Sequence, residues 1–249
     1  MKILVANPNT SVGVTDRLVA SAKLVASPGT EVLPMTASYG VPYIATRAEA
    51  AIGSAAMLDM LAERRGTIDA AIVAAFGDPG LGGARELFDF PVVGMAEAAM
   101  LMACTLGRRF GIVSFSRSLE PWFAEIVAWH GMSGRCAAIR TLDEGFRSID
   151  EVQEEKEAVL VELALRTVKD DAADVVILAG APLAGLANKI RDRVPVPLVD
   201  GIQAAVVMAE GLVRMNPRKA TAGTYRRPGP KESKGLSAAL ANVIGHRDK

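Results

Sequence analysis

The feature that most constrains the fold is a unit that occurs twice: an apolar run followed at once by a tight turn. In residues 71–81, AIVAAFGDPGL, an apolar run of strand type ends at Ala75 and Gly-Asp-Pro-Gly follows. Residues 175–186, VVILAGAPLAGL, repeat this design with a turn at Pro182. Proline fixes φ and glycine permits positive φ, so the chain must turn sharply at both places. Aligning the two units places Ala75 over Gly180.

The repeat continues into the next strand and helix of each half. Residues 90–99, FPVVGMAEAA, are similar to residues 196–205, VPLVDGIQAA. Ligands of open α/β sheets bind at the carboxyl ends of strands. We therefore expect two related half-molecules whose turns meet at one shared site.

Apolar runs alternate with helical patterns along the whole chain, which indicates parallel sheets with right-handed crossovers. Strands are predicted at 2–6, 30–36, 70–75, 91–93, from 110, at 137–140, 175–179 and 198–199, and helices at 12–25, 47–65, 81–87, 97–107, 119–130, 149–168, 203–215 and 236–244. The prediction is an α/β fold of two pseudo-symmetric lobes, each a mostly parallel four-stranded sheet flanked by helices, with the active site in the cleft between them. Lobe one should be discontinuous, with residues 1–97 and about 208–249, and lobe two should span about 98–207.

Composition narrows the class of protein. Half of the residues are apolar but only 5% are aromatic, which suits parallel strands covered by helices. The 28 basic and 28 acidic residues balance and form no basic stripe, so we expect no nucleic-acid partner. No apolar run reaches membrane-spanning length, and the start of the chain lacks the features of a signal peptide. These patterns predict a cytoplasmic protein without membrane contact.

The cysteines and histidines do not form a recognisable metal or disulfide pattern. Cys104 and Cys136 are the two cysteines, and both are predicted to be inert thiols. The histidines, His130 and His246, lie too far apart in the sequence to suggest a zinc site. His130 falls at a predicted helix end, so we expect it to be a surface or capping residue.

Four turns follow predicted strands and would supply hydrogen-bond donors near helix N-termini: residues 7–10, 77–80, 114–117 and 180–182. Such a cluster suits a small carboxylate or a polarised carbonyl. The candidate ligand contacts are Asn9, Thr10, Tyr43, Phe76, Gly77, Asp78, Ser114, Phe115, Ser116, Ala181 and Pro182. The predicted partner is therefore a small-molecule carbonyl or carboxylate compound.

Several of these residues also have a purely structural interpretation. Asp78 could orient a substrate amide or simply form a turn before proline. Glu97 and Asp200 lie at helix starts, where capping and the helix dipole favour acidic residues. Tyr43 could reach a ligand or pack as a lid. Ser114 has no evident base beside it in the sequence, which disfavours a serine hydrolase.

Taken in order, these motifs resemble the hydantoin and allantoin racemase branch of the Asp/Glu racemase superfamily. The resemblance covers nearly the whole chain and rests on residues 7–10, 76–81, 91–98, 185–187 and 200–201. It implies two similar α/β lobes, a homo-oligomer, and proton transfer beside a carbonyl without metal, nucleotide or flavin cofactor. It also implies one catalytic cysteine per lobe, on opposite faces of the substrate.

At the positions that match the family cysteines, this sequence has Ala75 and Gly180. Neither residue can carry a proton. Three explanations remain open. Ala75 could be an engineered replacement for cysteine; the chain could belong to a natural branch that acts as a lyase, decarboxylase or hydrolase; or it could be an inactive relative that binds a small molecule. The expected function is a racemase-like enzyme for a hydantoin, allantoin or another small carboxylate or amide.

Overall fold

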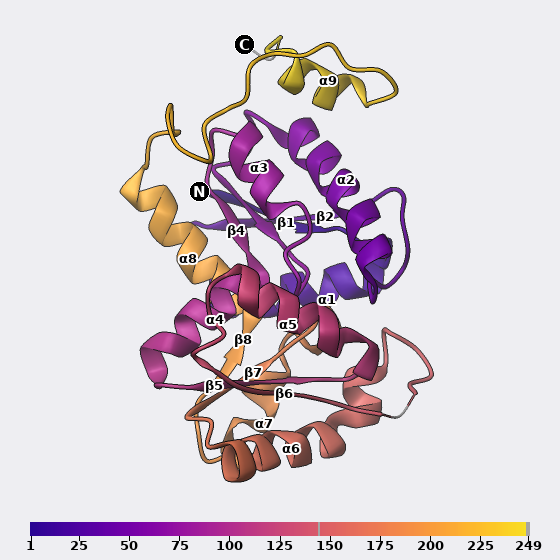
Figure 1. Cartoon of the computed structure of the whole chain (residues 1–249), viewed down its shortest axis with the longest axis vertical. Helices are drawn as coiled ribbons and strands as arrows, with labels where there is room; N and C mark the ends of the chain where they lie inside the picture. Colours follow the sequence, from indigo (N-terminus) through magenta and orange to yellow (C-terminus); the bar gives the residue numbers. More distant parts are fainter. Residues whose placement is uncertain (144, 248–249) are drawn as a thin grey trace.

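The computed structural model describes residues 1–143 and 145–247, and it consists of two stacked α/β lobes with the C-terminal segment at one end (Figure 1). The first sheet contains β1 (Lys2–Asn7), β2 (Glu31–Thr36), β3 (Ala70–Val73) and β4 (Val92–Gly94). The second contains β5 (Phe110–Ser114), β6 (Cys136–Thr141), β7 (Val175–Leu178) and β8 (Leu198–Asp200). The helices are α1 (Val12–Lys23), α2 (Arg47–Arg64), α3 (Leu81–Leu87), α4 (Met95–Leu106), α5 (Glu120–Trp129), α6 (Val152–Asp171), α7 (Leu186–Ile190), α8 (Gly201–Met215) and α9 (Ala238–Ile244), with short 3₁₀ turns at Arg117–Leu119, Ala181–Leu183 and Arg191–Arg193.

The two sheets have the same topology. The strand order is β2-β1-β3-β4 in lobe one and β6-β5-β7-β8 in lobe two, and every pairing is parallel. Both central strands of the repeated unit, β3 and β7, are buried along their whole length. A strand that is covered on both faces has to be continuously apolar, which is why the two runs read as strands in the sequence. The predicted fold class is confirmed.

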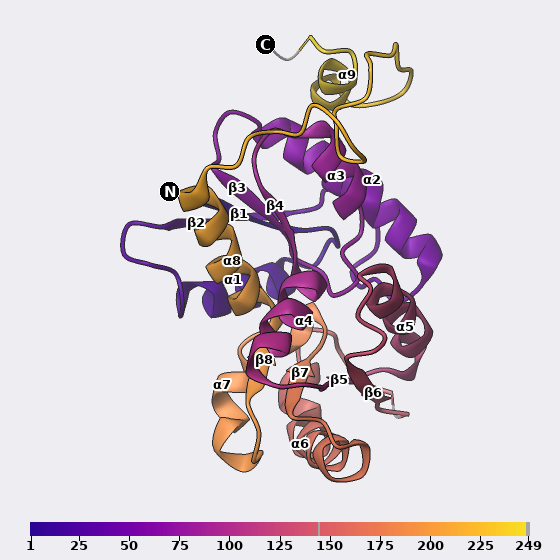
Figure 2. The ribbon, with the colours of Figure 1, turned by 60° about the vertical axis from the view of Figure 1, so that its left-hand side comes forward.

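Two helices cross from one lobe to the other. α4 follows β4 but packs on β7 of lobe two, and α8 follows β8 but packs on β3 and β4 of lobe one. The two helices also pack against each other between the sheets (Figure 2). The predicted lobe boundaries at residues 97 and 208 fall inside these crossing helices, and they stay a prediction.

Helix starts differ by a few residues from the predicted ones because of capping side chains. Asp200 accepts hydrogen bonds from the backbone N–H groups of Ile202 and Gln203, so α8 begins at Gly201 and not at 203. α4 begins two residues early, at Met95, because the carboxylate of Asp78 accepts from two N–H groups of its first turn. The capping role expected for Asp200 is confirmed.

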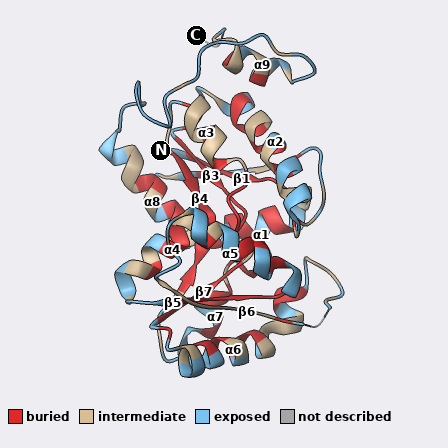
Figure 3. Cartoon of the chain, viewed as in Figure 1, coloured by how far each residue is buried: buried red, intermediate tan, exposed pale blue. Residues whose placement is uncertain are grey.

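Burial follows the sheets and the crossing helices, while residues 214–236 run over the surface (Figure 3). After this excursion α9 returns to α2, with Leu240 and Val243 buried in the apolar cluster of lobe one. This agrees with the prediction that the last helix packs on the first lobe. Of the helices in the described residues, none combines the length and apolarity needed to cross a membrane.

Candidate active site

A small cavity of about 30 Å³ lies where the carboxyl ends of the strands from both lobes meet. Its lining comes from the segments that follow β1, β2, β3, β5 and β7. The lining residues are Asn9, Tyr43, Ile44, Ala75, Phe76, Phe115, Leu119, Trp122, Phe123, Gly180, Ala181 and Pro182. The two turns of the sequence repeat therefore border one shared space.

The sequence identified most of this lining but not all of it. Eight predicted residues line the cavity: Asn9, Tyr43, Ala75, Phe76, Phe115, Gly180, Ala181 and Pro182. The other predicted contacts, Thr10, Gly77, Asp78, Ser114 and Ser116, are not part of the lining. Sequence reasoning missed Ile44, Leu119, Trp122 and Phe123, of which the last three belong to the 3₁₀ turn before α5 and to α5 itself. Their apolar character signals only a buried helix face, so no sequence motif marks them.

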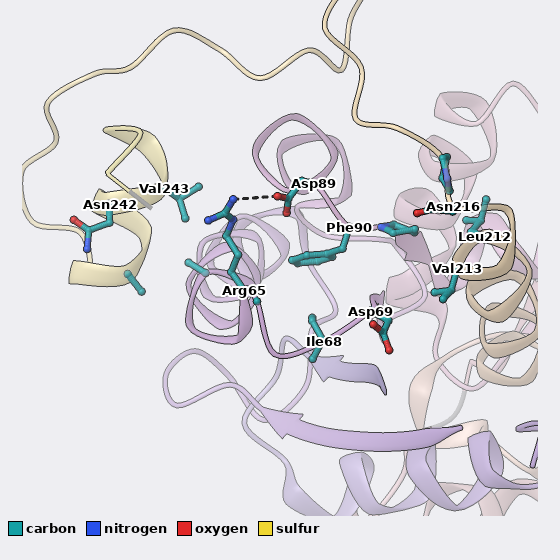
Figure 4. Close-up of a pocket in the computed structure, with 15 residues that line it drawn as sticks. Arg65, Ile68, Asp69, Asp89, Phe90, Leu212, Val213, Asn216, Asn242 and Val243 are labelled. Atoms are coloured by element: carbon teal, nitrogen blue, oxygen red, sulfur yellow. Dashed lines mark hydrogen bonds and ion pairs between the residues drawn. The ribbon is translucent and has the colours of Figure 1, made fainter. Parts of the chain in front are cut away.

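A larger groove of about 730 Å³ lies at the other edge of the lobe-one sheet, between α9 and the end of α8 (Figure 4). Asp69 and Pro91 precede β3 and β4, so this groove borders the amino ends of the strands. An Arg65–Asp89 ion pair spans part of it. Because ligands of open α/β sheets bind at the carboxyl ends, the small cavity is the better candidate site.

Asn9 presents an amide donor to the cavity. Its Oδ1 accepts hydrogen bonds from the backbone N–H of Ser11 and from Nδ2 of Asn7, both at 2.9 Å. The backbone N–H of Ser11 can only donate, so the atom of Asn9 that it contacts must be the amide oxygen. The Nδ2 group of Asn9 therefore points away from Ser11. Within the described ranges, Nδ2 of Asn9 makes no hydrogen bond. Asn9 as a residue is 5% exposed.

Tyr43 is held by an aromatic cluster that joins the two lobes. Its ring centroid lies 5.7 Å from that of Phe115 and 5.8 Å from that of Phe146. The hydroxyl is shut off from solvent and has no hydrogen-bond partner among the described residues. Burial raises the pKa of Tyr43 to about 12, although the nearby hydroxyls of Ser116 and Ser118 oppose that shift. The phenol is therefore protonated at neutral pH.

Ala75 and Gly180, where the sequence resemblance predicts the two catalytic positions, differ in what surrounds them. Ala75 is 7% exposed and lines the cavity directly. Gly180 has φ +114°, a conformation that side-chain-bearing residues rarely adopt, and a Cβ added there would lie 2.7 Å from a ring carbon of Phe115. Phe115 thus fills the space that a side chain at position 180 would need.

Asp78 does not line the cavity but contacts His130 of the other lobe. Its Oδ1 and Oδ2 accept hydrogen bonds from the backbone N–H groups of Ala96 and Glu97, each at 2.9 Å, and so cap α4. Nε2 of His130, at the end of α5, lies 3.0 Å from Oδ2. Burial raises the pKa of Asp78, opposed by these hydrogen bonds. Of its two interpretations, the structural one has direct support.

Of the two expectations for His130, capping is confirmed, because it is the C-cap residue of α5, but a surface position is wrong. Its side chain is 5% exposed and lies between two carboxylates, with Nδ1 3.7 Å from Glu97 and Nε2 near Asp78. Glu97 in turn pairs through both oxygens with Arg85. The sequence could not reveal this cluster, since 52 positions separate His130 from Asp78 and only tertiary packing brings them together.

The remaining polar candidates have partners elsewhere. Oγ of Ser114 donates to the carbonyl of Ala179 at 2.8 Å, which ties β5 to β7. The hydroxyls of Ser116 and Ser118 lie 2.9 Å apart and bond to each other. Burial raises the pKa of Cys136 to about 11, which agrees with an inert thiol. Across the described part of the chain, no group of three or more His, Cys, Asp and Glu side chains is placed to hold a metal ion.

The fold and this cavity define a class of protein: two parallel α/β lobes of the same topology whose strand ends enclose a small, aromatic-lined site. Residues 3–209 match the Asp/Glu/Hydantoin racemase family, and the chain belongs to that family. It is 32% identical to a hydantoin racemase of Paenarthrobacter aurescens over 93% of this chain and 99% of that protein.

Solved structures agree with this assignment. The allantoin racemase from Klebsiella pneumoniae has a TM-score of 0.91 and 33% identity, covering 96% of this chain and 98% of that one. The allantoin racemase AllR from Pseudomonas fluorescens has a TM-score of 0.88 and 34% identity, covering 94% and 100%. The predicted family resemblance is therefore confirmed.

Proposed function

We propose that this chain is a racemase-like enzyme that binds a small uncharged cyclic amide of the hydantoin class and acts at the carbon next to a carbonyl. Its family and its hydantoin and allantoin racemase relatives support this chemistry. The proposed site is the enclosed cavity, with Ala75 and Gly180 at the positions that correspond to the family cysteines. The other proposed ligand contacts are the predicted residues that line this cavity: Asn9, Tyr43, Phe76, Phe115, Ala181 and Pro182.

The proposed substrate class rests on the absence of charged side chains from the described cavity lining. No Asp, Glu, Lys, Arg or His side chain of the described residues lines the cavity. A free amino acid or a dicarboxylate would leave a buried charge without a counter-charge, which is strongly unfavourable. A hydantoin ring has no net charge, and its carbonyl groups need only donors such as the Asn9 amide.

The walls favour an apolar substituent on that ring. Five aromatic side chains line the cavity, although aromatics make up only 5% of the chain: Tyr43, Phe76, Phe115, Trp122 and Phe123. Aromatic surfaces gain little from the polar ureido group of allantoin but pack well on a hydrocarbon or phenyl group. We therefore expect 5-benzylhydantoin to bind more tightly than allantoin.

A cavity of about 30 Å³ is too small for a hydantoin, so its walls have to move apart when a ligand enters. Exposed ion pairs such as Arg47–Glu125 and Arg17–Glu154 link the lobes. Exposed pairs of this kind contribute little to stability, so they would not hold the lobes shut.

Neither Ala75 nor Gly180 can transfer a proton, so two-thiol racemisation cannot run from these positions. What the site can do is hold a ring carbonyl against fixed donors and stabilise the enolate that forms when a water molecule takes the α-proton. A second candidate function is a binding protein of the same specificity without turnover. The packing of Phe115 over Gly180 favours this candidate, because it removes space from one face of the site.

The test is exchange of the α-hydrogen of 5-benzylhydantoin and of allantoin in D₂O, followed by NMR, with the parent protein and with Ala75→Cys. A thiol at position 75 restores one acid–base group, which contributes about a hundred- to ten-thousand-fold in rate. The matched control is Ala20→Cys, which adds a thiol at an exposed site on α1. Exchange above the buffer rate in the parent supports the enzyme, and exchange in Ala75→Cys alone would show that the site becomes competent only when position 75 carries a thiol. Binding without exchange in both would support the binding protein, and no binding at all would refute both.

A further inference from the structure

Tyr43 is the one side chain in the cavity lining whose ordinary pKa allows it to give up a proton in water. The other described lining residues are aliphatic or aromatic hydrocarbons, an amide, an indole, a proline and a glycine. The sequence predicted that Tyr43 is either a ligand contact or a lid residue. The hydrogen bonding of its hydroxyl distinguishes these two roles.

The hydroxyl of Tyr43 has an unmet hydrogen-bonding requirement. It is buried, and in the described chain it has no hydrogen-bond partner. Ser116 and Ser118 lie close enough to lower the pKa of Tyr43 by hydrogen bonding, but neither hydroxyl meets hydrogen-bond geometry with it, and the two bond to each other. A buried hydroxyl without a partner is unfavourable in the free protein, so such groups are rare unless a ligand or water completes them.

The ring is fixed in place while its hydroxyl is left without a partner among the described residues. Phe115 and Phe146 pack against the Tyr43 ring, and these two rings also contact each other with centroids 5.5 Å apart. Phe115 follows β5 of lobe two, whereas Tyr43 belongs to the loop after β2 of lobe one. A rigid ring with a protonated hydroxyl is a pre-organised donor, which loses little conformational entropy on binding.

We propose that the Tyr43 hydroxyl donates a hydrogen bond to a ring carbonyl oxygen of the bound ligand, opposite the amide donor of Asn9. This inference rests on the proposed function, since it needs a ligand with a carbonyl group. Tyr43 remains protonated throughout and transfers no proton. Its contribution is to bind the carbonyl and to stabilise negative charge that develops on its oxygen.

Tyr39 provides a matched control in the same loop. Its hydroxyl already donates to Asp59 at 2.8 Å, and its residue is 43% exposed. Tyr39→Phe therefore removes a phenol of the same kind, from the same segment, without touching the cavity. The probe is 5-benzylhydantoin labelled with ¹³C at the ring carbonyl next to the α-carbon.

Two measurements on the full chain test the proposal. In calorimetry, Tyr43→Phe should weaken probe binding by about tenfold or more, because the carbonyl loses a buried donor. In infrared difference spectra, the labelled carbonyl band should shift to higher frequency in Tyr43→Phe. Tyr39→Phe should leave both unchanged.

Thermal unfolding separates this role from a structural one. Because the hydroxyl has no partner among the described residues of the free protein, Tyr43→Phe should unfold at the same temperature as the parent or higher. A lower unfolding temperature together with an unchanged carbonyl band would overturn the proposal, and so would unchanged binding. If the parent protein fails to bind the probe at all, the proposed function falls and this inference falls with it.

Discussion

In lobe one the carboxylate that caps crossing helix α4 comes from the turn after β3, whereas in lobe two the carboxylate that caps α8 comes from the last residue of β8. Asp78 serves the first helix and Asp200 the second. The residue of lobe one that aligns with Asp200 is Gly94. A Cβ added at Gly94 would collide with the carboxylate of Asp78. Each lobe therefore has a carboxylate at the N-terminus of its crossing helix, but the residue that supplies it comes from a different point in the repeated sequence.

Each of these carboxylates also receives a donor from the other lobe. His130, on α5 of lobe two, lies against Asp78 at 3.0 Å. Ser21, on α1 of lobe one, donates to Asp200 at 3.1 Å. α1 and α5 are the helices that follow the first strand of each lobe. The interface is thus pseudo-symmetric in its contacts, although one donor is an imidazole and the other a hydroxyl.

The tips of the repeated turns differ more strongly. Ala75 borders the cavity with an ordinary side chain, whereas Gly180 has positive φ and is covered by Phe115. Sequence alignment of the two units therefore identifies equivalent backbone positions, but it does not show whether each position has space for a side chain.

The largest expected effect comes from placing a side chain at Gly180. Gly180→Cys should lower the free energy of unfolding by about 3–5 kcal/mol, because it combines backbone strain with overlap of the Phe115 ring. Ala75→Cys should change it by less than about 1 kcal/mol, since it adds one atom beside a cavity. Urea unfolding of both variants measures the difference. Adding Phe115→Ala to Gly180→Cys should recover part of the loss; equal costs at the two positions would contradict the asymmetry.

The next largest effect should come from removing the Asp78 cap. Asp78→Gly should cost about 3 kcal/mol, because it leaves two backbone donors and His130 without their buried acceptor. Glycine also suits the positive φ of 47° at this position, so backbone strain does not add to the loss.

A second variant tests whether an aspartate at the N-cap position, as Asp200 is for α8, can also cap α4. Gly94 has φ −80° and ψ 136°, close to the −92° and 123° of Asp200. Gly94→Asp in the Asp78→Gly background should therefore recover part of the stability in urea unfolding, because the added Cβ still lies 2.7 Å from Cδ2 of Leu81, which has to shift. Gly94→Asp alone should be destabilising, because its Cβ would also overlap the carboxylate of Asp78. A double variant no more stable than Asp78→Gly would show that the two caps are not interchangeable.

A smaller effect is expected from the donors that cross between lobes. His130→Ala should cost about 2 kcal/mol and Ser21→Ala about 1 kcal/mol, because each removes a hydrogen bond to a buried carboxylate and the imidazole also loses packing. Chemical denaturation measures both, and Arg47→Ala, which removes an exposed interlobe ion pair, serves as the control that should leave the midpoint unchanged. A larger loss for Ser21→Ala than for His130→Ala would reverse the comparison.

The smallest effect concerns Glu210 on α8, whose carboxylate accepts hydrogen bonds from Ser27 and Thr30. Helix α4 has no acidic residue at the corresponding position. Burial alone would raise the pKa of Glu210, but hydrogen bonds from Ser27 and Thr30 lower it below the usual 4.5. A lowered pKa in the folded state means that this carboxylate stabilises the fold above pH 4.5 and that the contribution is lost as pH falls through the lowered pKa. By the alignment of the two halves, the corresponding residue of α4 is Cys104.

Glu210→Gln should therefore cost about 1 kcal/mol at about pH 7 and less at about pH 4, as judged by urea midpoints at the two pH values. Cys104→Ser provides a comparison whose effect should not vary over that range. A cost for Glu210→Gln that grows on acidification would contradict a lowered pKa for this carboxylate.

The candidate site shows where sequence reasoning succeeds and where it fails. The repeat and the turn residues led to Ala75, Gly180 and most of the cavity lining. They could not lead to Trp122 and Phe123, because an apolar helix face looks the same whether it covers a core or a cavity. They placed His130 correctly at a helix end but missed its buried side chain, since nothing near it in the chain reveals the two carboxylates that surround it.

By itself, the sequence determined the two parallel sheets, their equal topology and the positions of the strand-end turns. These follow from local causes: continuous apolar runs, helical spacing, and the backbone preferences of glycine and proline. Only the tertiary structure decided that Phe115 fills the space at Gly180, that Asp78 takes the place of a side chain at Gly94, and that the Tyr43 hydroxyl is buried without a partner among the described residues. Those outcomes depend on side chains from different lobes competing for the same volume, which no segment of the chain encodes alone.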